Sequence, residues 1–526
     1  MALNPELLQT LDVIQSLFAQ GNEVNKATNP SSYAGSGSTG FGLGILAAPS
    51  GYPTGVYGGF TPYNLEAGAR LLAPVITPVR NRMPRTRGKG TAIEFRAITN
   101  YNLNSAQSWA SEGVSGPMLA TGAVKVVFPY KIQSLYNQVS FESQYYGQGQ
   151  IDAMATATAN GLRAFMIAED NNMLFGNPAS GYTGGSAGGS AVSIGGALGT
   201  PSALTSANVV FAASGNGNAI TNSVYTGTIV NGTYDFRFSA VTGPGQETLV
   251  QSADYVVTPS TGPGYFVVQP PVIQGALFYN LYWKVTGDTN YTKLSFTGRV
   301  VLTSYTLAGG TVIPSSTGAT LPVTGNTDPN TGVAYADYSA NANAYAGIFQ
   351  QLLASGSGAT QLNIQRPLNM SNNAFTDLDN LMLNIWNNGQ GDPEMLLVNA
   401  FESMSITTGT LGAGTPYYVT PGGSQNGATA NLRVSRLINK VTGTEIEIIT
   451  HPRIPQGNML ALSMRLPSWY PGSDISAVFE FNTPVDYQQL AYAVTGPYFP
   501  FEIRNWGCVI CYLPLVSGVL SGISKG

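Results

Sequence analysis

The sequence predicts an α+β fold that is interrupted by an all-β sandwich. Residues 151–174 and 371–388 repeat apolar side chains at the spacing of amphipathic helices. Between these helices, residues 208–323 read as short alternating segments separated by Gly, Pro and Asn turns, which is typical of a β-sandwich. Residues 430–522 return to strand patterns. We therefore expect a sandwich inserted into an α+β parent.

The composition favours a protein that assembles with itself. Only 10% of the 526 residues are charged, against roughly 25% in ordinary soluble domains, and glycine is abundant at 63 residues. A surface with little charge is poorly protected against self-association. A surface that is buried between subunits needs less of this protection. A glycan-rich extracellular protein could have a similar composition. The net charge of −4 disfavours a general nucleic-acid binder.

Neither a signal peptide nor a transmembrane helix is expected. The N-terminal MALNPELLQTLDVIQSLF lacks the positive charge that opens a signal peptide, and its apolar residues are interrupted by polar ones. No apolar run reaches about 18 residues, the length of a membrane span. Asn4, Pro5 and Glu6 instead predict the start of a helix that ends at Gly21, and residues 22–60 predict an extended arm.

Residues 91–141 predict a long projecting hairpin. Its strands are expected at Thr91–Thr99, Val124–Pro129 and Gln133–Phe141, around a tip rich in Gly, Ser and Asn. The helix of residues 151–174 follows and should end at Gly176, before a Gly/Ser/Ala-rich linker.

The sandwich and the second half of the parent are also predicted in detail. Sandwich strands are expected at Val224–Ile229, Tyr234–Val241, Tyr255–Thr258, Tyr265–Val268, Phe278–Val285 and Thr292–Phe296. Ser371 should cap a helix that Gly389 stops, and a buried strand Met395–Val398 and a short helix Ala400–Ser405 should follow.

A cluster of positive charge is the most distinctive feature of the sequence. Residues 67–93 contain no acid and six basic residues: Arg70, Arg80, Arg82, Arg85, Arg87 and Lys89. These side chains could form a solvated face, contact DNA, or pair with carboxylates of an adjacent subunit. We favour inter-subunit contacts, because basic residues that alternate with Pro and Thr suit an extended segment lying on a neighbouring subunit better than an element that enters a groove of DNA.

No motif in the sequence predicts catalysis. Gly35–Gly40 has the GxGxxG spacing but lacks the strand, helix and acid that a dinucleotide site needs. Gly184–Gly188 has the GxSxG spacing but lies in the linker, and His451 is the only histidine that could serve Ser186. We therefore expect no enzyme and no cofactor.

Two further clusters predict structure rather than metal binding. Cys508 and Cys511 lie on a predicted buried strand about 10 Å apart, too far for a disulfide, and no second Cys/His pair completes a metal site. Buried thiols are expected. The acidic pairs Asp377/Asp379 and Glu169/Asp170 fall on the polar faces of predicted helices, where we expect solvated carboxylates.

Three stretches together resemble a known family. They are RLLAPVITPVRNRMPRTRGKGTAIEFRAIT, NGQGDPEMLLVNAFESMSIT and TGTEIEIITHPRIPQGNML. Their order and texture resemble the major capsid proteins of tailed bacteriophages with the Hong Kong 97 (HK97) fold. The segments NGTYDFRFSAVTGPGQETLV and GALFYNLYWKVTG resemble immunoglobulin or fibronectin III modules.

The resemblance implies a division of the chain into the parts of an HK97-like capsid fold. Residues 1–75 would be the N-terminal arm, 76–176 the extended loop and the spine helix of the peripheral domain, and 177–207 a linker. Residues 208–323 would be the immunoglobulin-like or fibronectin III-like insertion, 345–470 the axial domain, and 471–526 the closing strands of the axial and peripheral domains.

The resemblance also implies a function. The chain would self-assemble into hexamers and pentamers of an icosahedral head, part of the virion, in the cytoplasm of a host bacterium. The head would enclose double-stranded DNA without sequence specificity. Portal and decoration proteins are possible partners, and the lack of a scaffolding-type extension implies a separate scaffold protein or none. The alternative is a phage tail or fibre protein with a glycan-binding sandwich.

Overall fold

The computed structural model divides the chain into two compact units. It describes residues 74–100, 112–114, 122–146, 152–179, 182–184, 192–288, 291–304, 311–313, 321–323, 326, 334–369, 375–412, 434–470, 475 and 477–524. Unit 1 comprises Met1–Thr77, Gln133–Ala168 and Asp486–Asn505, and unit 2 comprises Pro78–Ile132, Glu169–Val485 and Trp506–Gly526. The expected N-terminal helix, the arm and the motif Gly35–Gly40 lie outside the described residues.

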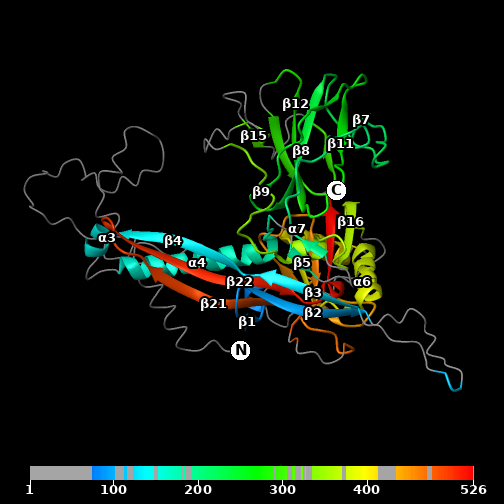
Figure 1. Cartoon of the computed structure of the whole chain (residues 1–526). Helices are drawn as coiled ribbons and strands as arrows, with labels where there is room; N and C mark the ends of the chain where they lie inside the picture. The colour runs from blue at the N-terminus through cyan, green and yellow to red at the C-terminus, as the bar shows by residue number, and fades with distance from the viewer. Residues whose placement is uncertain are drawn as a thin grey trace, which may run out of the picture. The chain divides into compact units, whose positions relative to one another are not determined.

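Unit 1 is built from one long helix and parts of three long strands. The strands are β4 (Lys131–Ser140), β21 (Phe479–Ala491) and β22 (Tyr498–Cys511), and β22 lies between the other two (Figure 1). The short helix α3 (Phe141–Tyr146) follows β4, and α4 (Ala153–Phe175) confirms the helix predicted at 151–174. A small core joins α4 to the strands through Val139, Phe165, Phe501 and Ile503.

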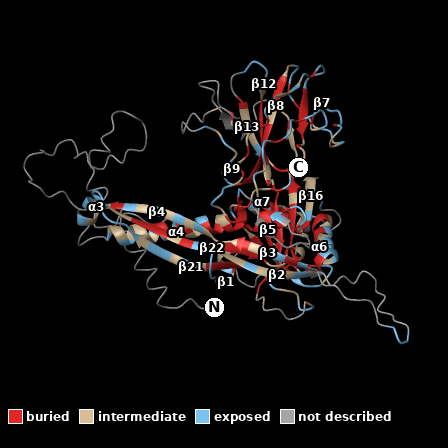
Figure 2. Ribbon diagram, viewed as in Figure 1, coloured by how far each residue is buried: buried red, intermediate tan, exposed pale blue. Residues whose placement is uncertain are grey.

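Unit 2 begins with residues 78–87, which we call the strap and which lead into the predicted hairpin. Helix α2 (Pro78–Arg82) and strand β1 (Arg85–Arg87) precede the antiparallel strands β2 (Ala92–Asn100) and β3 (Gly122–Pro129). Side chains alternate across the pleat of a strand, so β3 buries Val124, Val126 and Phe128 and exposes Lys125. The buried face of the hairpin packs on the main core, which Figure 2 shows in red.

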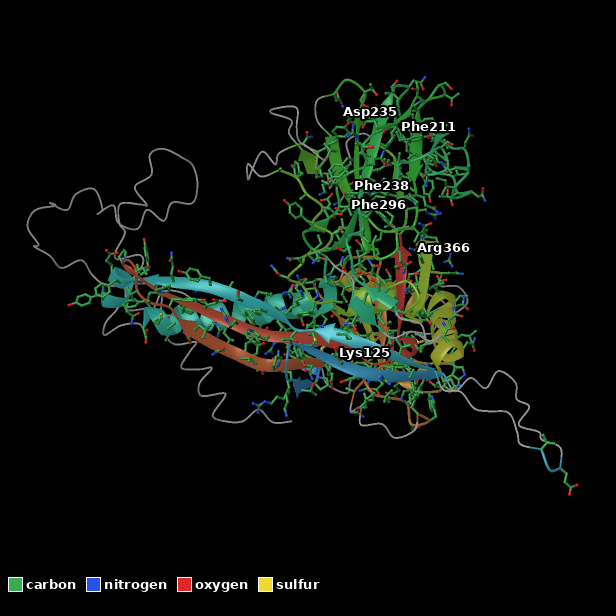
Figure 3. The ribbon with its side chains drawn as sticks, in the orientation of Figure 1. Lys125, Phe211, Asp235, Phe238, Phe296 and Arg366 are labelled. Carbon is green, nitrogen blue, oxygen red and sulfur yellow. The ribbon has the colours of Figure 1, made fainter. Side chains whose placement is uncertain are left out.

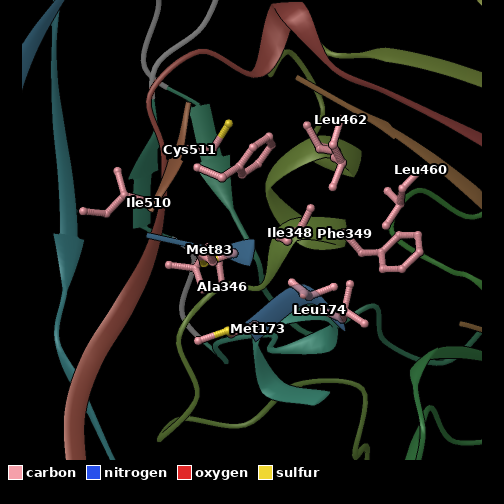
Figure 4. Packing of buried hydrophobic residues seen from close by; sticks show 14 of the residues in the cluster. Met83, Met173, Leu174, Ala346, Ile348, Phe349, Leu460, Leu462, Ile510 and Cys511 are labelled. Carbon is pink, nitrogen blue, oxygen red and sulfur yellow. The ribbon is translucent and has the colours of Figure 1, made fainter. Parts of the chain in front are cut away.

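The main sheet of unit 2 has helices on both faces. Its order is β16 (Thr360–Arg366), β23 (Gly518–Ile523), β20 (Met459–Leu462), β17 (Met395–Val398), β19 (Glu445–Thr450) and β18 (Arg436–Ile438). Strand β17 matches its prediction, and alternation sends its side chains to both faces. Leu396 and Val398 join the core under helices α6 (Thr376–Gly389) and α7 (Ala400–Gly412). Met395 and Leu397 join the core of helix α5 (Ile348–Leu353), and Figure 4 shows part of this core.

The inserted region consists of two facing sheets. One contains β10 (Tyr255–Val257), β8 (Tyr234–Gly243), β12 (Phe278–Val285), β13 (Tyr291–Phe296) and β15 (Thr311–Ile313), and β9 (Gln246–Glu247) pairs with β8. The other contains β14 (Val300–Leu302), β11 (Gly264–Val268) and β7 (Val209–Ala213). Phe236 and Trp283 from the first sheet pack against Phe266 from the second, and Figure 3 labels Phe211, Phe238 and Phe296 of the same core. The α+β fold with an all-β insertion is therefore confirmed.

Several predicted boundaries were wrong. Val224–Ile229 is not a continuous strand and makes only isolated bridges, from Val224 to Gly217 and from Ile229 to Gly264. A glycine is needed at position 227, because a Cβ there would lie 2.1 Å from the Gly264 oxygen. The sequence missed β7, β14 and β15 and the small pair β5 (Tyr182–Gly184) and β6 (Val192–Ile194) in the linker.

The start of α6 also differs from the prediction. The residue that caps it is Phe375, not Ser371, and α7 runs on to Gly412 rather than ending at Ser405. Asp377, in the first turn of α6, accepts a hydrogen bond from the Asn369 N–H at 2.8 Å.

Uncharged groups fasten the insertion to the main sheet of unit 2. The Gln269 Nε2 donates to Gln365 Oε1 at 2.6 Å, and the Thr297 hydroxyl donates to the Ile523 carbonyl at 2.9 Å. The Asn458 Nδ2 donates to the Leu277 carbonyl at 2.9 Å. Because no ion pair is among these contacts, salt should weaken them little.

Charged and tyrosine side chains of the insertion pair with one another. Lys293 lies 2.9 Å from Glu247, and Arg237 lies 2.5 Å from Asp254. Burial alone raises the pKa of Glu247, but the charge of Lys293 and hydrogen bonds from Lys293, Ser239 and Tyr282 outweigh it and hold that pKa below its usual value. For Asp254, burial is likewise outweighed by hydrogen bonds from Arg237 and Tyr291 and by the charge of Arg237, so its pKa is also lowered. Burial and the negative charge of Glu247 raise the pKa of Tyr282.

These directions predict a pH window for the stability of the insertion. A lowered carboxylate pKa stabilises the fold above the unfolded value of about 4, and this contribution is lost as the pH falls. A raised tyrosine pKa stabilises the fold below about 10, and this contribution is lost as the pH rises. We expect urea midpoints to be flat between these limits and to fall outside them. The variant Glu247→Gln should flatten the acid side; an unchanged acid side would contradict the assignment.

Candidate functional site

The predicted basic cluster is divided between internal ion pairs and the surface. Arg70 lies outside the described residues. Arg80 Nε and Arg85 lie 2.7 and 2.5 Å from the carboxylate of Glu169, and Arg82 lies 3.0 Å from Glu447. Arg87, at the end of β1, and Lys89, just after it, are exposed. Much of the charge predicted for contacts with other subunits is therefore already engaged within the chain.

The acidic pair on α4 is buried, so the expectation of solvated carboxylates at Glu169 and Asp170 was wrong. Both side chains are 0% exposed. Besides the two arginines on Glu169, the backbone N–H of Arg80 donates to Asp170 Oδ1 at 2.9 Å. His451 Nε2 and Arg453 lie 2.8 and 3.6 Å from Asp170 Oδ2. A buried charge is stable only when it is paired and hydrogen-bonded, and here both carboxylates are.

Two hydrogen bonds select one tautomer of His451. Its Nδ1 accepts a hydrogen bond from the backbone N–H of Arg453 at 3.2 Å, so the ring proton belongs on Nε2, which donates to Asp170. The ring is 0% exposed. The only histidine of the chain therefore joins the turn after β19 to α4. Ser186 itself lies outside the described residues.

Magnetic resonance can test this tautomer directly, because isotopically labelled histidine gives signals from a single ring in this protein. We expect a protonated Nε2 and an unprotonated Nδ1 at neutral pH. A signal from a protonated Nδ1 would contradict the hydrogen bond from Arg453.

The result of these contacts is a buried charge cluster, which we define as Glu169, Asp170, Arg80, Arg85, His451 and Arg453. It joins three segments of unit 2 that are far apart in sequence: the strap, the C-terminal part of α4 and the turn after β19. Arg85 also lies 4.9 Å above the ring of Phe481, which adds a cation–π contact. The cluster thus holds the base of the β2–β3 hairpin in place.

The second acidic pair is divided. Asp377 is 2% exposed and forms two hydrogen bonds with the guanidinium of Arg366, at 2.9 and 2.7 Å, so the prediction that it is solvated was wrong. Asp379 is partly exposed and lies 2.5 Å from Lys440. Sequence reasoning missed Arg366 and Arg453 as partners, because no local pattern marks a distant arginine as the partner of a buried acid.

The remaining candidate motif is structural. Cys508 and Cys511 are free and buried on β22, as predicted, and burial raises the pKa of both thiols. Such thiols are poor nucleophiles and poor metal ligands.

Among the residues that the structure describes, no group of three or more His, Cys, Asp and Glu is placed to hold a metal ion. Within the same residues, no helix combines the length and apolar character that crossing a membrane requires.

Comparisons with known proteins gave structural matches only. No protein-family model and no curated protein matches the chain. A virus-like particle from Pyrococcus furiosus aligns with 33% of this chain at 14% identity and a TM-score of 0.21, and the chain spans 59% of that protein. The capsid of a native GTA particle aligns at 9% identity over 91% of this chain and 98% of its own, with a TM-score of 0.37. The capsid of cyanophage A-1(L) aligns at 11% identity over 86% and 94%, with a TM-score of 0.35.

Proposed function

We propose that the chain is the major capsid protein of a tailed bacteriophage and that it self-assembles into hexamers and pentamers of an icosahedral head around double-stranded DNA. The observation that carries the proposal is the order of elements. A hairpin, the long helix α4, an all-β insertion, a sheet covered by helices and closing strands follow one another along the chain. This is the order that the sequence resemblance to HK97-like capsid proteins implies.

Exposed apolar side chains support a role in assembly. On unit 1, Tyr136, Phe141 and Tyr145 are 58, 53 and 61% exposed. Large apolar side chains that gather on a surface mark sites of interaction, because burying them against a partner is favourable. A chain with few charges and such a surface suits a lattice of contacts between many copies.

Under this proposal the parts of the chain take the roles that the resemblance assigns. The strap and the hairpin would form the extended loop, α4 the spine helix, and the main sheet of unit 2 the axial domain. The insertion would be an immunoglobulin-like or fibronectin III-like module. Arg87 and Lys89, which the structure leaves exposed, would be the members of the basic cluster that contact a neighbouring subunit.

Deletion of the insertion separates this proposal from a tail or fibre adhesin. Residues 208–323 would be replaced by a short Gly/Ser linker and the product examined by electron microscopy. We expect the remaining chain still to assemble into shells or rings, because most residues of the parent's two cores lie outside the insertion, which contributes Leu277 and Phe278 to one of them. A variant that is folded but no longer assembles would contradict the proposal.

A further inference from the structure

A cavity lies where the insertion meets the rest of unit 2, and we call it the amide pocket after its lining by Gln274, Gln361, Asn384 and Asn388. Its volume is about 550 Å³, within the range of roughly 300–1,000 Å³ that is usual for small-molecule sites. Gln274 comes from the insertion, Gln361 from β16 and the two asparagines from α6, which lies beside β16 in Figure 1. The pocket therefore draws on segments that only the fold brings together.

One wall of the amide pocket is held in place by its two glutamines. The Gln274 Nε2 donates to the Leu353 carbonyl and, at 2.6 Å, to Gln361 Oε1. The Gln361 Nε2 donates to the carbonyls of Leu352 and Ala354 at 2.7 and 3.3 Å. These bonds use both hydrogens of each amide. Within the described part of the chain, Gln274 Oε1 then has no donor, so it is a fixed acceptor that a ligand can use.

A second wall is formed by α6. Asn384 and Asn388 are one turn apart, so their amides lie on the same face of the helix, and both are exposed. The Asn388 Nδ2 donates to the Thr360 hydroxyl at 3.2 Å, which orients that amide. The amide of Asn384 makes no hydrogen bond with the residues that the structure describes. This wall thus offers both donors and acceptors.

The loop between α5 and β16 keeps the amide pocket open. Gly356 and Gly358 line it, with φ angles of 80 and 81°. Side chains of L residues rarely adopt this region of φ, so glycine suits both positions. Because neither residue has a side chain, neither fills the space between the two walls.

The chemistry of the lining fits a neutral ligand with many hydroxyl groups. None of the described residues that line the amide pocket is charged, so an anion or a cation would find no ion-pair partner. Amides and the hydroxyl of Ser355 both donate and accept hydrogen bonds, as sugar hydroxyls do. An apolar ligand would desolvate these groups without pairing them. Leu515 and Ala359 add a small apolar area that suits the C–H groups of a sugar ring.

We propose that the amide pocket is a binding site for a neutral saccharide. The amides of Asn384 and Asn388 and the Gln274 Oε1 would hydrogen-bond to its hydroxyl groups, and Leu515 would contact its ring. This inference goes beyond the proposed function, because self-assembly does not require the pocket and the pocket does not require assembly.

Saturation-transfer magnetic resonance with the full-length protein tests the pocket. The probes are glucose, galactose, mannose, rhamnose and N-acetylglucosamine, each titrated separately. We expect at least one to bind, and glucuronate, which is negatively charged, to bind more weakly than glucose. The double variant Asn384→Ala/Asn388→Ala should weaken binding by about tenfold or more, because it removes two hydrogen-bonding groups. Asn387→Ala is the matched control, since Asn387 is exposed on the same helix but does not line the pocket.

A second variant, Ser355→Trp, fills the amide pocket from an exposed loop position and should abolish binding without touching α6. Circular dichroism checks that each variant is folded. If none of the five sugars binds, the proposal is wrong. If a sugar binds and neither the double variant nor Ser355→Trp weakens its binding, the sugar lies elsewhere on the chain and the assignment of the pocket is wrong. An equal loss in Asn387→Ala would also contradict the assignment.

Discussion

The substitution Glu169→Gln is expected to lower the free energy of unfolding by about 3–5 kcal/mol. Glutamine keeps the shape of the side chain but removes the charge that both Arg80 and Arg85 face. These two guanidinium groups are largely buried, with side-chain exposures of 16 and 23%, so water cannot replace the lost carboxylate well. Urea unfolding followed by circular dichroism measures the change.

The control for this prediction is Glu447→Gln. Its pair with Arg82 has a similar distance, 3.0 Å, but exposures of 52 and 40%, so its loss should cost no more than about 1 kcal/mol. Equal effects of the two variants would show that the buried charge cluster does not hold the strap.

The second large effect is expected from Phe266→Ala in the insertion. Phe266 is 0% exposed, and its ring lies 5.0 Å from Phe236, 5.2 Å from Tyr234 and 5.1 Å from Phe211. Removing a buried phenylalanine leaves a cavity and costs about 3–5 kcal/mol. Hydrogen exchange should show faster exchange across both sheets of the insertion.

Phe211 provides the matched control, because it belongs to the same aromatic group but is only partly buried. We expect Phe211→Ala to cost clearly less than Phe266→Ala. If the two variants behaved alike, the contact between the two sheets would not be the core of the insertion.

Periodic patterns predicted the elements whose faces are set by burial. Helix α4, strand β12 and strand β17 were found because regular runs of apolar residues mark a buried face. Strands β14 and β15, which have three residues each, were missed. Val224–Ile229 alternates like a strand, yet it forms only isolated bridges, which depend on partners that the fold brings from elsewhere in the chain.

The charged site was harder to predict for a physical reason. An acid on a helix is usually solvated, and its burial depends on partners that the fold brings from elsewhere. Glu169 meets Arg80 and Arg85 from more than 80 residues away, and Asp170 meets His451 from 281 residues away. Sequence identified the basic cluster as unusual, but the structure was needed to show which of its members face inward.

Electron microscopy of the purified full-length protein, with particle sizes checked by light scattering, tests the central claim most directly. The account predicts closed shells, or rings of five and six copies, under conditions that favour assembly. A stable trimer or an extended fibre under the same conditions would contradict it and favour a tail protein.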